Sequence, residues 1–254
     1  MKLSIFLAGI RPSNWLKLYQ SIPGTTTTDD YELVIVSPYD LPPELSDKKN
    51  VRIIKDSGCP TRCYQLGALH SRGEFIVCAA DDGIFTPTMS IDKAFAARPP
   101  HSKGIVSFTY FEGDITSEYK PVSMPWHLGE HSIMRMLKYA PNHYLLLASF
   151  LVRRDYFLEA GGWDCQFEQP GIACIDLAIR LQNDGAEVVL GEKYMDIAQD
   201  LGREGRASHQ PIEDAHIFND LPLLQKMYQT VPNRGRIDFD NWKNAEEVWH
   251  RRFG

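Results

Sequence analysis

The sequence has no uninterrupted apolar run of about 18 residues, which is the length that a membrane-spanning helix needs. The apolar part of residues 1–15 is also too short for a signal peptide, and we expect a first strand there instead. No Gly-x-Gly-x-x-Gly motif follows a predicted strand, which argues against a Rossmann dehydrogenase. These absences predict a cytoplasmic protein without a transmembrane segment or a secretion signal.

Basic residues are not in excess. Lys and Arg number 27 against 33 Asp and Glu, which gives a formal net charge of −6 and a pI near 5.8. Proteins that bind nucleic acids or anionic membranes usually carry a basic surface. We therefore do not expect nucleic acid among the partners.

Cysteine is too scarce for a disulfide framework or a zinc site. Five cysteines are an odd number in a chain without a secretion signal, which favours free thiols in a reducing compartment. Cys59 and Cys63 lack the second pair of ligands that a zinc site needs. His127 and His131 are four residues apart and would share one face of a helix, but no third ligand lies nearby in the sequence.

The sequence does contain enough apolar material for a full core, since 43% of its 254 residues are hydrophobic. Strands are predicted at residues 3–8, 31–36, 51–55, 75–79, 104–110, 144–152 and 186–190. Helices are predicted at residues 12–22, 60–71, 87–97, 126–139, 153–160 and 221–228, and one more ends at Asp184. This alternation predicts an α/β fold with a mostly parallel central sheet flanked by helices.

Two adjacent carboxylates follow a predicted buried strand. Residues 75–79 form an unbroken run of apolar or small residues, and Asp81 and Asp82 come directly afterwards. Open α/β sheets bind their ligands at this carboxyl end of the strands. Neighbouring carboxylates repel each other unless a positive charge is close, and a divalent cation can supply that charge. The alternative is that Asp81 caps a turn and Asp82 caps a helix that begins near Pro87.

The strand and its Asp-Asp pair resemble the metal-binding Asp-x-Asp region of glycosyltransferases with the GT-A (Rossmann-like) fold, in particular the family-2-like enzymes that use nucleotide sugars. The resemblance implies that Asp82 binds Mn²⁺ or Mg²⁺ on the diphosphate of the donor, with Asp81 beside it. Ala80 departs from the commonest form of this motif, in which an Asp stands at that position.

The first 100 residues resemble the nucleotide-binding half of these enzymes. The implied nucleotide contacts lie at the end of the first strand, after the second strand and at the start of the helix at 60–71. They are Ala8, Gly9, Arg11, Asp40 and Arg62. Each charged residue also has an ordinary alternative, because Arg11 and Asp40 suit solvent-exposed turns and Arg62 can pair with Asp56.

Residues 101–200 resemble the acceptor and catalytic half. The run Gly161-Gly162-Trp163 is implied to contact the donor sugar, since adjacent glycines allow the backbone to approach a ligand closely.

Asp176 is the residue to which the resemblance assigns the general base, with Glu168 as the alternative. The usual Glu-Asp pair of the family is replaced by Ala173 and Cys174, which leaves Asp176 as the last acidic position of the motif. The other interpretation of Asp176 is a carboxylate in the first turn of a helix, stabilised by the helix dipole.

The Gly- and Arg-rich residues 202–210 predict a surface loop near the diphosphate. The resemblance implies that Arg206 binds the diphosphate and that His209 reaches the metal, with a solvated loop as the alternative. We expect one main domain over residues 1–230, and a C-terminal helical tail, 231–254, packed on it through aromatic anchors.

Together these features predict a metal-assisted glycosyltransferase that moves a sugar from a nucleotide-diphosphate donor to a hydroxyl of a glycan, a lipid-linked molecule or another acceptor. Two alternatives stay open. Ala80 and Cys174 motivate a non-catalytic module that binds nucleotide sugars or glycans. A nucleotidyltransferase would also use paired Asp residues, but it usually has a glycine-rich loop where this chain has residues 8–12.

Overall fold

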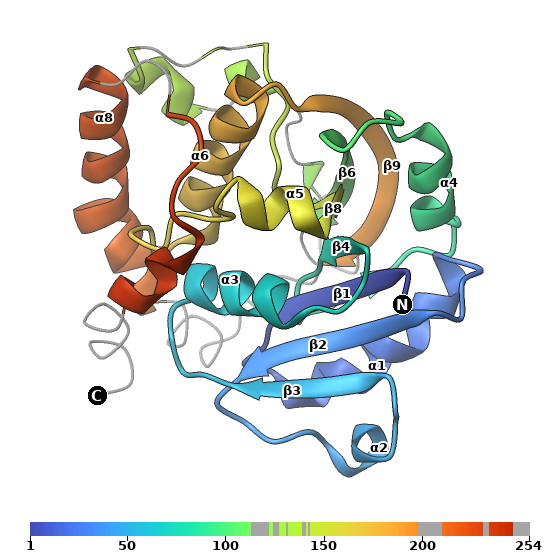
Figure 1. The fold of residues 1–254 in the computed structure, drawn as a ribbon. Coiled ribbons are helices and arrows are strands. Elements are labelled where there is room, and N and C mark those ends of the chain that lie inside the picture. The colour runs from blue at the N-terminus through green and yellow to red at the C-terminus, as the bar shows by residue number, and fades with distance from the viewer. Residues whose placement is uncertain are drawn as a thin grey trace.

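A curled, mixed sheet runs through the protein, as the computed structural model shows in Figure 1. The structure describes residues 1–112, 122–123, 127–130, 132–138, 141, 143–197, 210–230 and 234–245. The predictions for Arg206, His209 and His131 fall outside these residues. Within the described part of the chain, no helix is both long and apolar enough to cross a bilayer.

In the described part of the chain, nine strands form the sheet in the order β3-β2-β1-β4-β8-β6-β9-β5, with β7 paired to β6. Their bounds are β1 Leu3–Ala8, β2 Tyr31–Ser37, β3 Val51–Lys55, β4 Phe75–Cys78, β5 Gly83–Phe85, β6 Gly104–Glu112, β7 Val122–Ser123, β8 Phe150–Arg153 and β9 Glu187–Ile197.

Only part of the sheet is parallel, so the expected mostly parallel sheet is a mixed one. Strands β3, β2, β1 and β4 are parallel, and so are β6 and β9, whereas β8 is antiparallel to both of its neighbours and β5 is antiparallel to β9. A parallel pair needs a long crossover, usually a helix. The described residues between β6 and β8 contain only the short 3-10 helices Leu128–Glu130 and Ser132–Met136, and the chain returns antiparallel.

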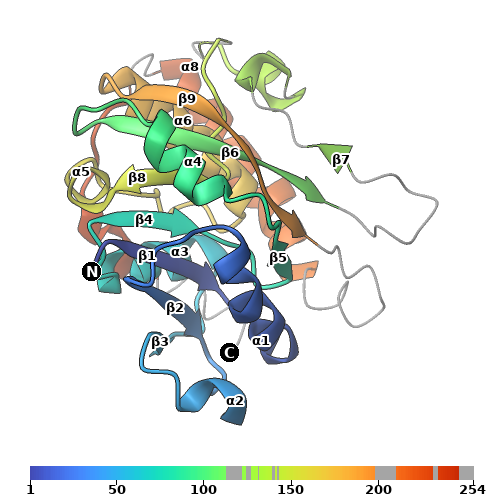
Figure 2. The same cartoon turned by 90° about the vertical axis from the view of Figure 1, so that its right-hand side faces the viewer.

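Helices cover both faces of the sheet, as the two views in Figures 1 and 2 show. One face carries α1 (Pro12–Ser21) and α4 (Ser90–Ala97), and the other carries α3 (Pro60–His70), α5 (Arg154–Glu159) and α6 (Pro170–Asn183). The remaining helices are α2 (Pro43–Ser46), α8 (Leu221–Thr230), the 3-10 helices Ile22–Gly24 and Phe239–Ala245, and the π-helical turn His216–Asp220.

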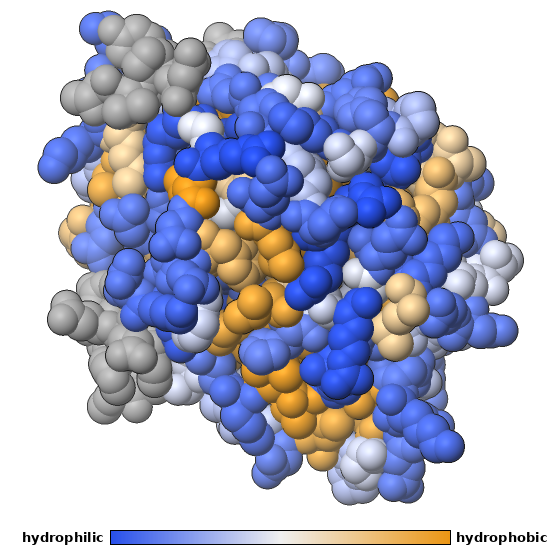
Figure 3. All heavy atoms as spheres, in the orientation of Figure 1, coloured by the Kyte–Doolittle hydropathy of each residue, from blue (hydrophilic) through white to orange (hydrophobic). Residues whose placement is uncertain are grey.

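Alternation along the strands divides the core between the two faces. In β1, Ile5 and Leu7 pack with the residues of α1 and α4, while Phe6 points to the α3 and α6 side. Hydrophilic residues cover most of the surface seen in Figure 3. The apolar runs of the sequence therefore form the core of a three-layer α/β/α structure.

Three segments differ from the prediction. Residues 83–85 form the edge strand β5 on β9, so the helix expected from Pro87 starts only at Ser90. Residues 126–139, expected as one helix, contain the two 3-10 helices. The strand expected at 144–152 begins only at Phe150. The apolar residues before it are buried in the same core cluster as α6, and the backbone N–H and carbonyl of Leu145 form hydrogen bonds with the side chain of Gln182.

Candidate active site

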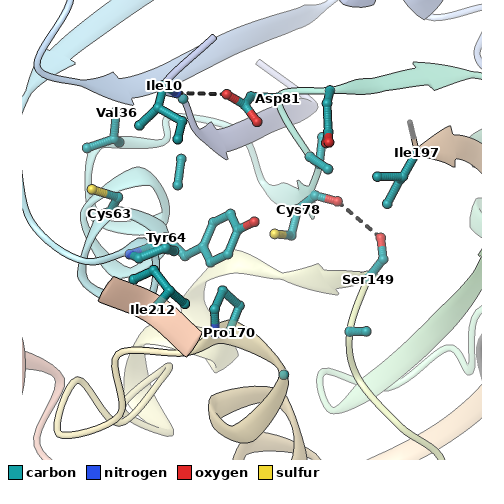
Figure 4. A pocket seen from close by; sticks show the side chains of 18 of the residues that line it. Ile10, Val36, Cys63, Tyr64, Cys78, Asp81, Ser149, Pro170, Ile197 and Ile212 are labelled. Carbon is teal, nitrogen blue, oxygen red and sulfur yellow. Dashed lines mark hydrogen bonds between the residues drawn. The ribbon is translucent and has the colours of Figure 1, made fainter. Parts of the chain in front are cut away.

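A cavity of about 360 Å³ opens at the carboxyl ends of β1, β2 and β4, where ligands bind in open α/β sheets. In Figure 4, the Tyr64 side chain lies in this cavity, between Asp81 on one side and Pro170 and Ile212 on the other. The apolar part of the wall includes Val36 and Pro38. The cavity also brings together four of the predicted residues, Ala8, Gly9, Arg11 and Asp81, and the predicted metal ligand Asp82.

Asp81 connects the end of β4 to the loop after β1 through hydrogen bonds. Its Oδ2 accepts hydrogen bonds from the backbone N–H groups of Ile10 (2.7 Å) and Arg11 (2.9 Å). Its Oδ1 lies 2.5 Å from Nη1 of Arg11. The side chain is 6% exposed, and this carboxylate therefore shapes the cavity wall as well as lining it.

Asp82 is the carboxylate that fits a divalent cation. It lines the cavity with its side chain 13% exposed, and its Oδ2 lies 3.9 Å from the Arg11 guanidinium. Carboxylate oxygens are the ligands that Mn²⁺ and Mg²⁺ take readily. Within the residues that the structure describes, no three His, Cys, Asp or Glu side chains gather around a common point.

Asp40 and Arg62 do not line the cavity, and the nucleotide contacts expected of them stay predictions. Asp40 is 93% exposed and pairs with Lys55. Arg62 is almost fully buried and binds Asp56 through two nitrogens (3.1 and 2.9 Å). Its Nη1 donates to the carbonyl of Trp242 at 2.5 Å, and its guanidinium lies over the Trp242 ring. The alternative pairing with Asp56 is thus the observed one.

The Gly161-Gly162-Trp163 turn also lies outside the cavity lining. Both glycines have positive φ, 94° and 61°. A Cβ on Gly161 would lie 2.2 Å from the carbonyl oxygen of Ile237, and one on Gly162 would lie 2.2 Å from Oε1 of Gln65. Protein packing alone is therefore enough to require both glycines, and the predicted sugar contact stays a prediction.

Trp163 belongs to the core rather than to a donor site. Its side chain is 1% exposed and packs edge-on against Phe6 and Phe157, with ring centroids 5.8 and 4.9 Å apart. Its backbone N–H donates to Gln65 at 2.9 Å.

Asp176 is fully buried in a network of charges and does not line the cavity. Its Oδ2 accepts from Nε of Arg180 at 2.6 Å, and its Oδ1 accepts from Nη1 of Arg234 at 2.5 Å and from the hydroxyl of Tyr228 at 2.8 Å. Arg234 also binds Asp164 at 2.6 Å. Burial raises the pKa of Asp176, but the two arginines and the hydrogen bonds outweigh burial and leave this pKa below its usual value.

The Asp176 carboxylate is thus enclosed by three partners, and the general-base role expected of it stays a prediction. The network joins α6, α8 and the turn after α5.

Glu168 lies just beyond the cavity wall. Its side chain is buried, its backbone N–H donates to Asp220 at 3.0 Å, and its carbonyl accepts from Thr61 at 3.1 Å. The following residues, Gln169 and Pro170, do line the cavity.

Several cavity residues were missed by the sequence analysis. Burial raises the pKa of Tyr64 well above its usual value, so its hydroxyl remains a hydrogen-bond donor. Ser149 and Tyr194 both donate to the carbonyl of Cys78, at 3.1 and 2.9 Å. Glu213 reaches the cavity from the helical residues 210–215. A single Glu on a polar helix gives no local signal that its side chain faces a cavity.

No family model and no curated protein matches the sequence. Solved structures do match its fold. A structure of TarS from S. aureus is 11% identical, with a TM-score of 0.53, and the match covers 99% of this chain and 43% of that one. A shorter TarS structure in complex with UDP-GlcNAc gives the same identity and TM-score, with 99% and 72% covered.

GalNAc-T7, in a structure with UDP, GalNAc and Mn²⁺, is 10% identical with a TM-score of 0.55, and the match covers 98% of this chain and 57% of that one. This chain therefore spans about half of the longer chains that it matches. At these identities the likeness concerns the fold, and it confirms the resemblance found in the sequence at that level. The chain has the fold of the GT-A glycosyltransferases.

Proposed function

We propose that this protein transfers a sugar from a nucleoside-diphosphate sugar to an acceptor hydroxyl with the help of Mn²⁺ or Mg²⁺. The observation that carries the proposal is the cavity at the strand ends, with Asp82 in its wall, in a sheet with the GT-A fold. Structures of similar fold contain UDP, UDP-GlcNAc or Mn²⁺. The five cysteines are all free, which supports a reducing, cytoplasmic location.

We infer one orientation of the donor in the cavity. The nucleoside would lie against the apolar wall around Val36, Pro38 and Gly9, which belongs to the nucleotide-binding half, residues 1–100. The diphosphate would then lie at Asp82, where a bound cation neutralises the charge of the leaving group. Arg206 and His209 remain proposed partners of the diphosphate and the metal.

The general base is proposed to be Glu213. Among the described residues, the carboxylates that line the cavity are those of Asp81, Asp82 and Glu213. Asp81 and Asp82 face Arg11, whereas Glu213 extends from a different wall and is exposed. Glu168, which adjoins the cavity wall at Gln169, is the second candidate.

A screen of nucleotide sugars, with Mn²⁺ and with a chelator, tests the proposal. We expect one donor to raise the melting temperature only with metal and to be hydrolysed or transferred, and Asp82→Ala to abolish the effect of the metal. Binding without turnover would favour the alternative of a non-catalytic nucleotide-sugar module, which Ala80 and Cys174 motivate and with which the buried Asp176 agrees. Equal affinity with and without metal would exclude the metal role.

A further inference from the structure

The guanidinium of Arg11 lies where the Asp-Asp pair needs a positive charge. Its Nη1 is 2.5 Å from Asp81 and 3.9 Å from Asp82, and the side chain is 15% exposed at the cavity wall. Two adjacent carboxylates repel each other in a partly buried place unless a cation is near. Arg11 therefore supplies from within the chain the charge that a divalent metal would bring.

We propose that Arg11 is an exchangeable counter-cation: it occupies the cation position at Asp82 in the free protein, and it turns to the diphosphate of the donor when metal binds. This inference rests on the proposed function. It makes Arg11 a positioning residue for metal and donor together.

The loop that carries Arg11 allows this exchange. Its backbone N–H, and that of Ile10, are held by Oδ2 of Asp81, while Pro12 begins α1 directly afterwards. The backbone is thus fixed at both sides, and rotation of the side chain alone can move the guanidinium. An arginine cannot give up its proton in a protein, so it has to move when a second cation arrives.

The diphosphate of the donor is a suitable partner for the Arg11 guanidinium after it leaves Asp82. A guanidinium matches the oxygens of a phosphate with two parallel hydrogen bonds, and the N-terminus of a helix such as α1 favours a negative charge nearby. Arg11 lines the same cavity as Asp82, so a diphosphate bound at Asp82 lies within the same space.

Titration of the full chain with Mn²⁺ alone, followed by calorimetry or by the EPR signal of free Mn²⁺, tests the inference. Arg11→Gln should bind Mn²⁺ at least about tenfold more tightly than the wild type, because a cation 3.9 Å from Asp82 is removed. Arg11→Lys, which keeps the charge, should stay close to the wild type. Arg98→Gln is the matched control, because the Arg98 guanidinium of the wild type binds the carbonyls of Pro99 and His101.

A second titration uses UDP in the presence of saturating Mn²⁺. Here Arg11→Gln should bind at least about tenfold more weakly than the wild type, since the cation that meets the diphosphate is gone. Arg11→Met replaces Arg11→Gln if the latter does not fold. Unchanged Mn²⁺ affinity, or unchanged affinity for UDP in the presence of Mn²⁺, would overturn the inference. A wild type that binds both ligands but turns over no donor would instead contradict the proposed function and leave these two measurements valid.

Discussion

Three carboxylates line the cavity within the described chain, and their surroundings give them different roles. Asp81 receives two backbone N–H groups and the Arg11 guanidinium, so it holds the loop after β1 in place. Asp82 shares the guanidinium at a longer distance, and its side chain lines the cavity. Glu213 stands on a separate helical segment and is exposed, as a base that meets an incoming acceptor has to be.

Glu213→Gln is expected to separate donor binding from chemistry. The amide keeps the size of the side chain but cannot take a proton, so transfer should fall by about 10²–10⁴-fold while donor affinity changes little. The measurement is kcat for transfer, together with calorimetric donor affinity. Asp214→Asn serves as the matched control, since its side chain does not line the cavity, and Glu168→Gln tests the second candidate. Full transfer by Glu213→Gln, with a loss in Glu168→Gln, would move the base to Glu168.

At the scale of elements, the turn after α5 links three parts of the fold. Gln65 of α3 donates to the carbonyls of Gly161 and Phe239, and it accepts from the N–H of Trp163. The N–H of Ile237 donates to the carbonyl of Ala160. The two glycines are the condition for this close approach, because each leaves no room for a Cβ.

Gly161→Ala is therefore expected to destabilise the protein without acting on the cavity. The added Cβ meets the Ile237 backbone at 2.2 Å, and φ is 94°, so the cost should exceed about 1 kcal/mol. Urea unfolding measures this difference. Gly235→Ala is the matched control, because nothing lies within 4 Å of its added Cβ. A loss of donor affinity in Gly161→Ala at full stability would restore the sugar-contact role.

At the scale of the whole molecule, the Asp176 network connects elements that are distant along the chain. Tyr228 and Arg234 reach it from positions 52 and 58 residues away, and Arg180 carries the connection to the carbonyl of Gly162. All of these groups are buried or largely buried. Removal of one charge leaves its partners uncompensated in the core, and that is costlier than losing an exposed ion pair.

Asp176→Asn should lower the free energy of unfolding at neutral pH by about 3–5 kcal/mol. The pKa of Asp176 is lowered in the folded state, so its contribution is present above the unfolded pKa of about 3.9 and is lost as pH falls through the lower folded value. The stability of the variant should therefore fall less below pH 4 than that of the wild type.

Urea unfolding at several pH values measures this, with Asp240→Asn as the control, since Asp240 is 52% exposed in its pair with Lys243. The control should change stability by no more than about 1 kcal/mol. A stable Asp176→Asn variant with reduced transfer would instead support the general-base role that the sequence motif implied.

The sequence by itself determined the features that depend on neighbours along the chain. Apolar runs and alternation located most strands and helices, since a side chain points to a face according to its position in the element. Asp81 and Asp82 were identified as cavity residues because the carboxyl end of a buried strand follows from the strand itself. Together with the Gly-Gly-Trp-Asp run, this was enough to recognise the GT-A fold.

Only the tertiary structure decided which charges are paired. Arg11 meets Asp81 across 70 residues, Arg62 meets the Trp242 carbonyl across 180, and Tyr228 closes over Asp176 across 52. Local patterns contain no information about such partners, because packing of separate elements brings them together. The sequence motif predicts a catalytic base at Asp176, and only the tertiary structure shows that this carboxylate is buried among distant arginines.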